Sequence, residues 1–70
     1  MKKTIYIDGM SCNHCKMRVE NTLKEMQGIT EAVVNLDGKL AEVELTSDID
    51  NAVIIEAIDD IGFDVVKIEG

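Results

Sequence analysis

Residues 32–45 read AVVNLDGKLAEVEL, two runs in which apolar and polar residues alternate, joined at Asp37-Gly38. The apolar positions are Ala32, Val34 and Leu36 on one side and Ala41, Val43 and Leu45 on the other. An Asp-Gly pair between alternating apolar residues is the strongest short-range signal for a β-hairpin. This stretch therefore predicts two antiparallel strands that turn one face to a core.

A strand and a helix are predicted before this hairpin. Thr4–Ile7 alternates like a strand and stops at the turn pair Asp8-Gly9. The next apolar residues have helical spacing and predict a helix that begins at Cys15. Its buried stripe is Cys15, Val19, Leu23 and Met26. Gly28 lies where the C-cap glycine of that helix is expected.

A second helix and a last strand are predicted after the hairpin. Residues 47–50 supply N-cap candidates, and the apolar stripe of the helix is Ile54, Ala57, Ile58 and Ile61. Gly62 closes the helix, and a strand covers about residues 63–68. The order is β-α-β-β-α-β, which predicts an α+β, ferredoxin-like domain: a four-stranded antiparallel sheet with two helices on one face. Residues 1–70 form a single domain in this interpretation.

Charge and length limit the possible functions. The net charge is −7, with about +2 on residues 1–27 and −9 on residues 28–70. Nucleic acid is not an expected partner, because binding phosphates requires a basic surface. No apolar stretch approaches the ~20 residues of a membrane span, so membrane insertion is not expected. With no secretory signal at the start, we expect a cytoplasmic protein with reduced thiols.

The two cysteines form a C-x-x-C pair at the start of the first helix. Unpaired N–H groups and the positive end of the helix dipole favour thiolates there, and Lys16 and Arg18 should add to this effect. Two soft anionic ligands suit Cu(I), whereas structural zinc and iron–sulfur clusters usually need four ligands. Cys12 and Cys15 are therefore the predicted ligands of one Cu(I) ion.

Three neighbours of the cysteines carry side chains that could also reach a metal. His14 lies between the cysteines and is predicted to be a solvated spacer. Met10 is predicted to pack in the core, where methionine often fills gaps. Met17 lies opposite the buried stripe, so it should be exposed, either as a docking contact or as an ordinary surface residue.

The loop GMSCNHC, residues 9–15, resembles the metal-binding loop of the heavy-metal-associated domain family. The resemblance runs from Thr4 to Ile68 and is strongest to bacterial cytosolic copper chaperones. It implies Cu(I) bound by Cys12 and Cys15 and delivered to a related domain of a copper-transporting P-type ATPase. A copper-responsive repressor is the second partner class that it implies. We expect an apo monomer, with a copper-bridged dimer left open, and Lys16, Arg18 and Lys24 steering the encounter with an acidic partner.

Other interpretations remain open at this point. Phe63 follows Gly62 where chaperones of the family usually have Tyr, which leaves an excised N-terminal domain of a copper-transporting ATPase as the alternative. The zinc branch tends to have an acidic residue where this chain has Ser11, and mercury carriers are typically exported. A thiol–disulfide oxidoreductase could also use C-x-x-C, but the chain has no Pro, no Trp and two aromatic residues. We therefore do not expect an enzyme.

Overall fold

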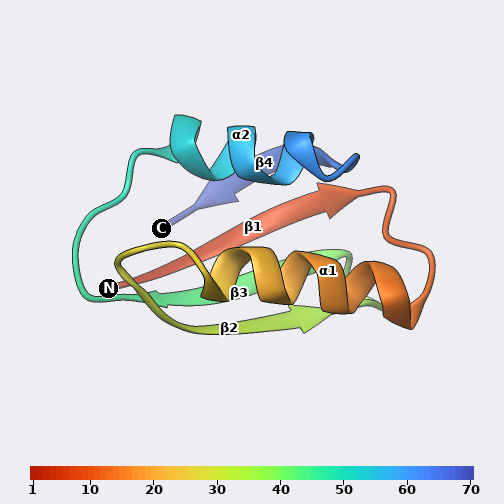
Figure 1. Ribbon diagram of the computed structural model, residues 1–70, viewed down its shortest axis with the longest axis horizontal. Coiled ribbons are helices and arrows are strands. Elements are labelled where there is room, and N and C mark those ends of the chain that lie inside the picture. Colours follow the sequence, from red (N-terminus) through yellow and green to blue (C-terminus); the bar gives the residue numbers. More distant parts are fainter.

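The computed structural model describes residues 1–70 and has the six predicted elements in the predicted order (Figure 1). The elements are β1 (Lys2–Asp8), α1 (Asn13–Lys24), β2 (Ile29–Asn35), β3 (Leu40–Leu45), α2 (Asn51–Asp60) and β4 (Asp64–Glu69). Neither helix has the length and apolar character that crossing a bilayer requires.

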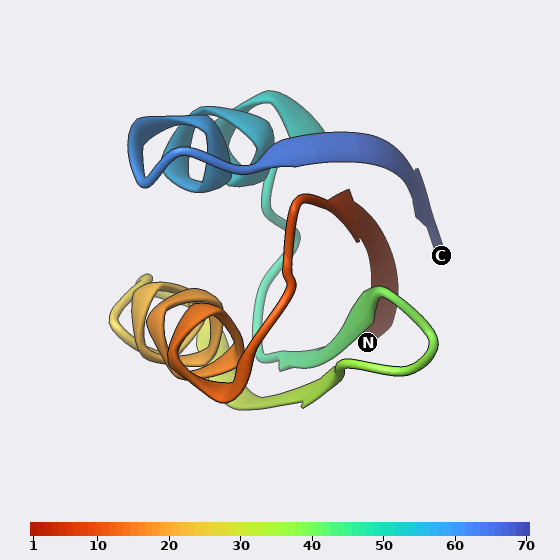
Figure 2. The same ribbon diagram turned by 90° about the vertical axis from the view of Figure 1, so that its right-hand side faces the viewer.

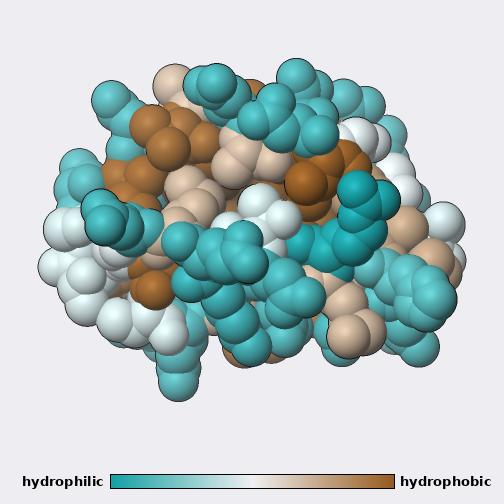
Figure 3. Space-filling view, in the orientation of Figure 1, coloured by the Kyte–Doolittle hydropathy of each residue, from teal (hydrophilic) through white to brown (hydrophobic).

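The four strands form one antiparallel sheet in the order β2-β3-β1-β4. Both helices lie on the same side of this sheet, and its other face is open (Figure 2). The predicted ferredoxin-like arrangement is therefore confirmed. In the space-filling view, hydrophilic atoms cover the front of α1, while apolar atoms gather between the two helices (Figure 3).

The core between helices and sheet is entirely apolar. Its central side chains are fully buried and come from both layers: Ile5, Ile7, Val19, Leu23, Val43, Ile54 and Ile58. Both predicted helical stripes thus face the sheet. Met26 and Ile61, the last members of the stripes, are partly buried and lie just beyond the ends of their helices.

The β2–β3 hairpin forms where the Asp-Gly pair predicts it, but its loop has four residues. Asn35 pairs with Leu40, so residues 36–39 connect the strands. The Oδ1 atom of Asn35 accepts a 2.9 Å hydrogen bond from the N–H of Gly38. Lys39, not Gly38, takes the left-handed conformation, with a φ of 56°.

The helix ends differ in part from the sequence prediction. Helix α1 begins two residues before Cys15, with Cys12 as its N-cap. The prediction that Gly28 caps this helix is wrong: the C-cap is Glu25, and Gly28 has a φ of +97° in the turn before β2. Gly62 does end α2, because its N–H and that of the following residue bond back to the carbonyls of the last turn in a Schellman motif.

Both edge strands contain a bulge. On β4, Val66 is the extra residue between the pairs Tyr6–Lys67 and Ile7–Val65. On β2, Thr30 is the extra residue, and the register shifts at that point. The bulge in β4 explains why the two inward residues of that strand, Val65 and Ile68, are three positions apart instead of two.

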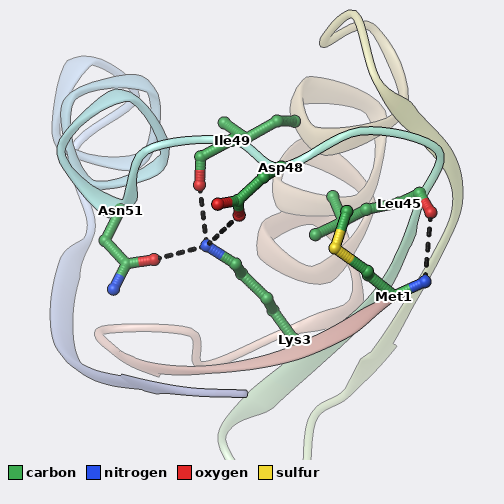
Figure 4. A network of polar contacts seen from close by, with 6 residues as sticks. All are labelled: Met1, Lys3, Leu45, Asp48, Ile49 and Asn51. Atoms are coloured by element: carbon green, nitrogen blue, oxygen red, sulfur yellow. Dashed lines mark hydrogen bonds and ion pairs between the residues drawn. The ribbon is translucent and has the colours of Figure 1, made fainter.

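A buried lysine stem holds the loop before α2. The Nζ of Lys3 donates hydrogen bonds to the carbonyl oxygen of Ile49 (2.7 Å) and to Oδ1 of Asn51 (2.8 Å), and it lies 3.6 Å from Asp48 (Figure 4). The side chain of Lys3 is only 10% exposed. The N-cap residue Asp50 makes no side-chain cap, and Lys3 ties the start of α2 to β1 through Ile49 and Asn51.

Candidate metal site

Cys12 and Cys15 meet at the end of the molecule where β1 passes into α1. Their Sγ atoms lie 3.5 Å apart, and the Cys12 thiol donates a hydrogen bond to the sulfur of Cys15. Cys12 is exposed, whereas Cys15 is half-buried and packs against the core. The carbonyl oxygen of Cys12 accepts the first helical hydrogen bond from the N–H of Lys16 (3.1 Å). Both thiols are free.

The loop before Cys12 is shaped by a glycine and a buried methionine. Gly9 has a φ of +100°, and a Cβ atom there would lie 3.4 Å from Cδ1 of Phe63. Gly9 therefore allows the turn, since glycine alone takes this conformation without steric cost. Met10 is 6% exposed and belongs to the core, as predicted. Met10 thus anchors the loop to the core, while Cys12 is exposed to solvent.

Hydrogen bonds lower the pKa of the Cys15 thiol. The largest cause is a backbone hydrogen bond from Ser11, followed by the side-chain hydrogen bond from Cys12, while partial burial acts in the opposite direction. One thiol is thus easier to ionise, as expected. The expected contribution of Lys16 and Arg18 is not among the causes. Unpaired N–H groups at the helix start were expected to favour the thiolate, but the role of Ser11, which precedes the N-cap, depends on a loop geometry that the sequence does not show.

The remaining sequence candidates lie around the pair without joining it. His14 and Met17 are exposed, Met17 to 57%. No group of three or more His, Cys, Asp or Glu side chains comes together. That placement agrees with His14 as a spacer, which stays a prediction.

The three basic residues of α1 are not equivalent. Lys24 forms an ion pair with Glu20 at 3.1 Å. It also lies nine residues after Cys15, about 13 Å along the helix at ~1.5 Å per residue. Lys16 and Arg18 adjoin the cysteines and form no ion pair in the structure. Lys16 and Arg18 are thus the unpaired cations beside the cysteines, and the steering role of the three basic residues stays a prediction.

Comparison with known proteins finds one family model and several similar copper proteins. The heavy-metal-associated domain model matches residues 4–64. A relative from Bacillus subtilis (strain 168), called copper chaperone CopZ, is 37% identical over 67 residues, which cover 94% of this chain and 97% of the relative. Among solved structures, a CopZ metallochaperone is 37% identical with a TM-score of 0.87, covering 94% of this chain and all of the other. A copper-binding domain from HMA7, a P-type ATPase, is 30% identical with a TM-score of 0.83 over the whole of both chains.

This chain belongs to the heavy-metal-associated domain family. The match covers the cysteine loop, both helices and the first three strands. The resemblance found from the loop at residues 9–15 is therefore confirmed.

Proposed function

We propose that this chain is a copper chaperone. It holds one Cu(I) ion between the Sγ atoms of Cys12 and Cys15 and delivers it to the C-x-x-C motif of a copper-transporting P-type ATPase. A copper-responsive repressor is a second class of recipient, and the cytoplasm is the compartment we assign. The observation that carries the proposal is the pair of free thiols 3.5 Å apart at an exposed helix start.

The chemistry of the site supports Cu(I) as the cargo. Thiolates are soft ligands, and Cu(I) is a soft ion that thiolates select. The hydrogen bond from Ser11 favours the anionic form of Cys15, which is the form that binds metal. The relatives that span nearly the same length carry the name copper chaperone, which describes a carrier and not an enzyme.

The asymmetry of the pair suits release by ligand exchange. Exposed Cys12 can be approached from solvent, whereas Cys15 is held against the core. A thiolate of the partner adds to the ion, a three-sulfur intermediate forms, and one thiolate of this chain leaves as the next partner thiolate binds. Each entering thiolate replaces one that departs, so the step needs no oxidant or reductant.

The test is an anaerobic Cu(I) titration against a chromophoric chelator. The wild-type protein should bind one ion per monomer, and Cys12→Ser and Cys15→Ser should each lose tight binding. Ser47→Ala, in the loop at the far end of the molecule, is the control and should bind like wild type. Tight binding retained in Cys12→Ser contradicts the proposal. A Zn(II) titration in parallel tests the zinc alternative, and size-exclusion chromatography with and without copper tests the copper-bridged dimer.

A second candidate is a metal-binding domain that forms part of a copper-transporting ATPase. Phe63 in place of the Tyr usual in chaperones, and the full-length likeness to the HMA7 domain, favour it. Both candidates use the same cysteine pair. The length of the open reading frame decides between them, because the ATPase candidate requires a coding sequence that continues into membrane-spanning segments.

A further inference from the structure

The tip of the β2–β3 hairpin lies at the same end of the molecule as the cysteine loop (Figure 1). Lys39, the last residue of this tip, is the one non-glycine residue with a positive φ. Its carbonyl oxygen accepts a 2.9 Å hydrogen bond from the N–H of Ile7. Strained backbone conformations cluster at functional sites. The positive φ of Lys39 therefore suggests a role for its bond to Ile7, which lies next to the cysteine loop.

Ile7 is the last core residue before the cysteine loop, and β4 and the hairpin tip hold it from two sides. Its side chain is 1% exposed, and Asp8 and Gly9 follow at once. On the β4 side the register shifts between Tyr6 and Ile7, at the Val66 bulge, and Ile7 pairs with Val65 beyond it. On the β3 side the regular pairing of β1 ends at Tyr6. The Lys39 carbonyl therefore supplies the bond that holds the end of β1 toward β3.

We infer that Lys39 is a positioning residue for the metal site: its left-handed backbone aims a carbonyl at Ile7 and so fixes where the cysteine loop begins. The inference rests on the proposed function, since it concerns the geometry of the same thiol pair. The backbone conformation, and not the ammonium group, carries the role. A residue that adopts a positive φ easily should preserve it, and one that avoids a positive φ should lose it.

Two substitutions separate backbone from charge. Lys39→Gly removes the charge but keeps the conformation accessible, whereas Lys39→Val removes the charge and disfavours the conformation. Asp37→Val places the same side chain in the same loop without touching Ile7. Lys3→Met weakens the opposite end of the molecule and controls for general loss of stability. If Lys39→Val does not fold, Lys39→Ala replaces it, because alanine has the same preference in milder form.

The first measurement is amide hydrogen exchange of Ile7 in the apo protein, relative to central amides of β1 and β3. We expect exchange at least tenfold faster in Lys39→Val and within about threefold of wild type in Lys39→Gly, Asp37→Val and Lys3→Met. The second is the affinity for phenylarsine oxide, which condenses with two neighbouring thiols and releases one water. Lys39→Val should weaken it at least fivefold, and the other three variants should not.

The third measurement is the Cu(I) affinity of the same variants. It should fall in the same variants in which the affinity for phenylarsine oxide falls. Wild-type exchange at Ile7 or wild-type arsenical affinity in Lys39→Val overturns the inference. An effect of Lys39→Gly or Lys3→Met as large as that of Lys39→Val also overturns it. If wild type binds no Cu(I) while Lys39→Val still weakens arsenical binding, the inference holds and the proposed function fails.

Discussion

The ammonium group of Lys3 on β1 donates a 2.7 Å hydrogen bond to the carbonyl oxygen of Ile49, a residue 46 positions later in the chain. This bond joins the first strand to the entrance of α2 (Figure 4). The side chain of Lys3 is largely buried, while its ammonium group contacts Ile49, Asn51 and Asp48. Such an arrangement stabilises the fold at the end of the molecule away from the cysteines.

Replacing Lys3 should therefore destabilise the protein without affecting metal binding. Lys3→Met keeps the apolar stem but leaves the Ile49 carbonyl without its donor. We expect the free energy of unfolding to fall by about 1–3 kcal/mol, the range for an unsatisfied buried group. Urea denaturation at pH 7 measures it. Lys2→Met is the matched control: its side chain is 82% exposed, and its contact with Glu44 is 3.9 Å long, so stability should change by less than about 0.5 kcal/mol. Equal losses in the two variants argue against the role of Lys3.

His14→Ala should leave Cu(I) affinity within a few-fold of wild type. His14 is exposed and no cluster of three potential ligands forms around the cysteines, so no coordinate bond is removed. Competition with a chelator at pH 7 measures the affinity. A loss of more than a hundredfold shows instead that His14 is a ligand, because changes outside the ligand shell typically cost 10- to 100-fold.

Reversing the charges of Lys16 and Arg18 should slow copper transfer and leave affinity nearly unchanged. These cations flank the cysteines, where they can attract an acidic partner, and such attraction raises association rates in a salt-dependent way. The measurement is the transfer rate to an ATPase metal-binding domain at low and high ionic strength.

Lys24→Glu provides the comparison for this experiment. Because Lys24 is paired with Glu20 and lies at the far end of α1, its reversal should have a much smaller effect on transfer. A double reversal at Lys16 and Arg18 that transfers as fast as wild type at low salt removes the docking role of these residues. The copper site itself does not depend on that result.

Tyr6 should titrate above the pKa of about 10 typical of tyrosine. Its hydroxyl donates a 2.9 Å hydrogen bond to Glu69, and that bond and the carboxylate charge raise the pKa. Absorbance near 295 nm reads this directly, because the chain has one Tyr and no Trp. Since the pKa is raised on folding, the contribution of this contact to stability is complete below pH 10 and is lost as the pH rises through the folded pKa. Glu69→Gln should lower the midpoint of the Tyr6 titration, whereas Glu56→Gln on α2 should not.

Most of the fold could be predicted from the sequence because the apolar periods are regular. The stripes of both helices and the alternation in β1, β2 and β3 identify the elements, and one hydrophobic face for each leaves few packings. Periodicity could not place Val66, because a bulge breaks the two-residue period and depends on pairing with another strand. It could not show that Lys39 takes the left-handed conformation in place of Gly38, because that choice depends on the loop length set by the pair Asn35–Leu40.

The closeness of the two cysteines could be predicted from the sequence, whereas the electrostatics of the pair could be predicted only in part. Cysteine spacing identified Cys12 and Cys15, and the structure brings their sulfur atoms together. Backbone N–H groups were expected to favour the thiolate, and a backbone hydrogen bond from Ser11 is the main cause, whereas the added effect expected from Lys16 and Arg18 is not among the causes. The ion pair between Lys24 and Glu20 has the i,i+4 spacing that a helix brings together, so the sequence already contained the signal for it.

The two bulges have a consequence for how the molecule behaves at high concentration. They lie on β2 and β4, the two edges of the sheet, where unpaired backbone groups could template the addition of another chain. A bulge twists the strand and interrupts the even row of donors and acceptors that such addition requires. The bulge interrupts β4 in its middle and β2 only near its start, and Val33 and Val66 are 63% and 67% exposed on these two edge strands. We therefore expect the bulged parts of these edges to template edge-to-edge growth less readily than straight strands would.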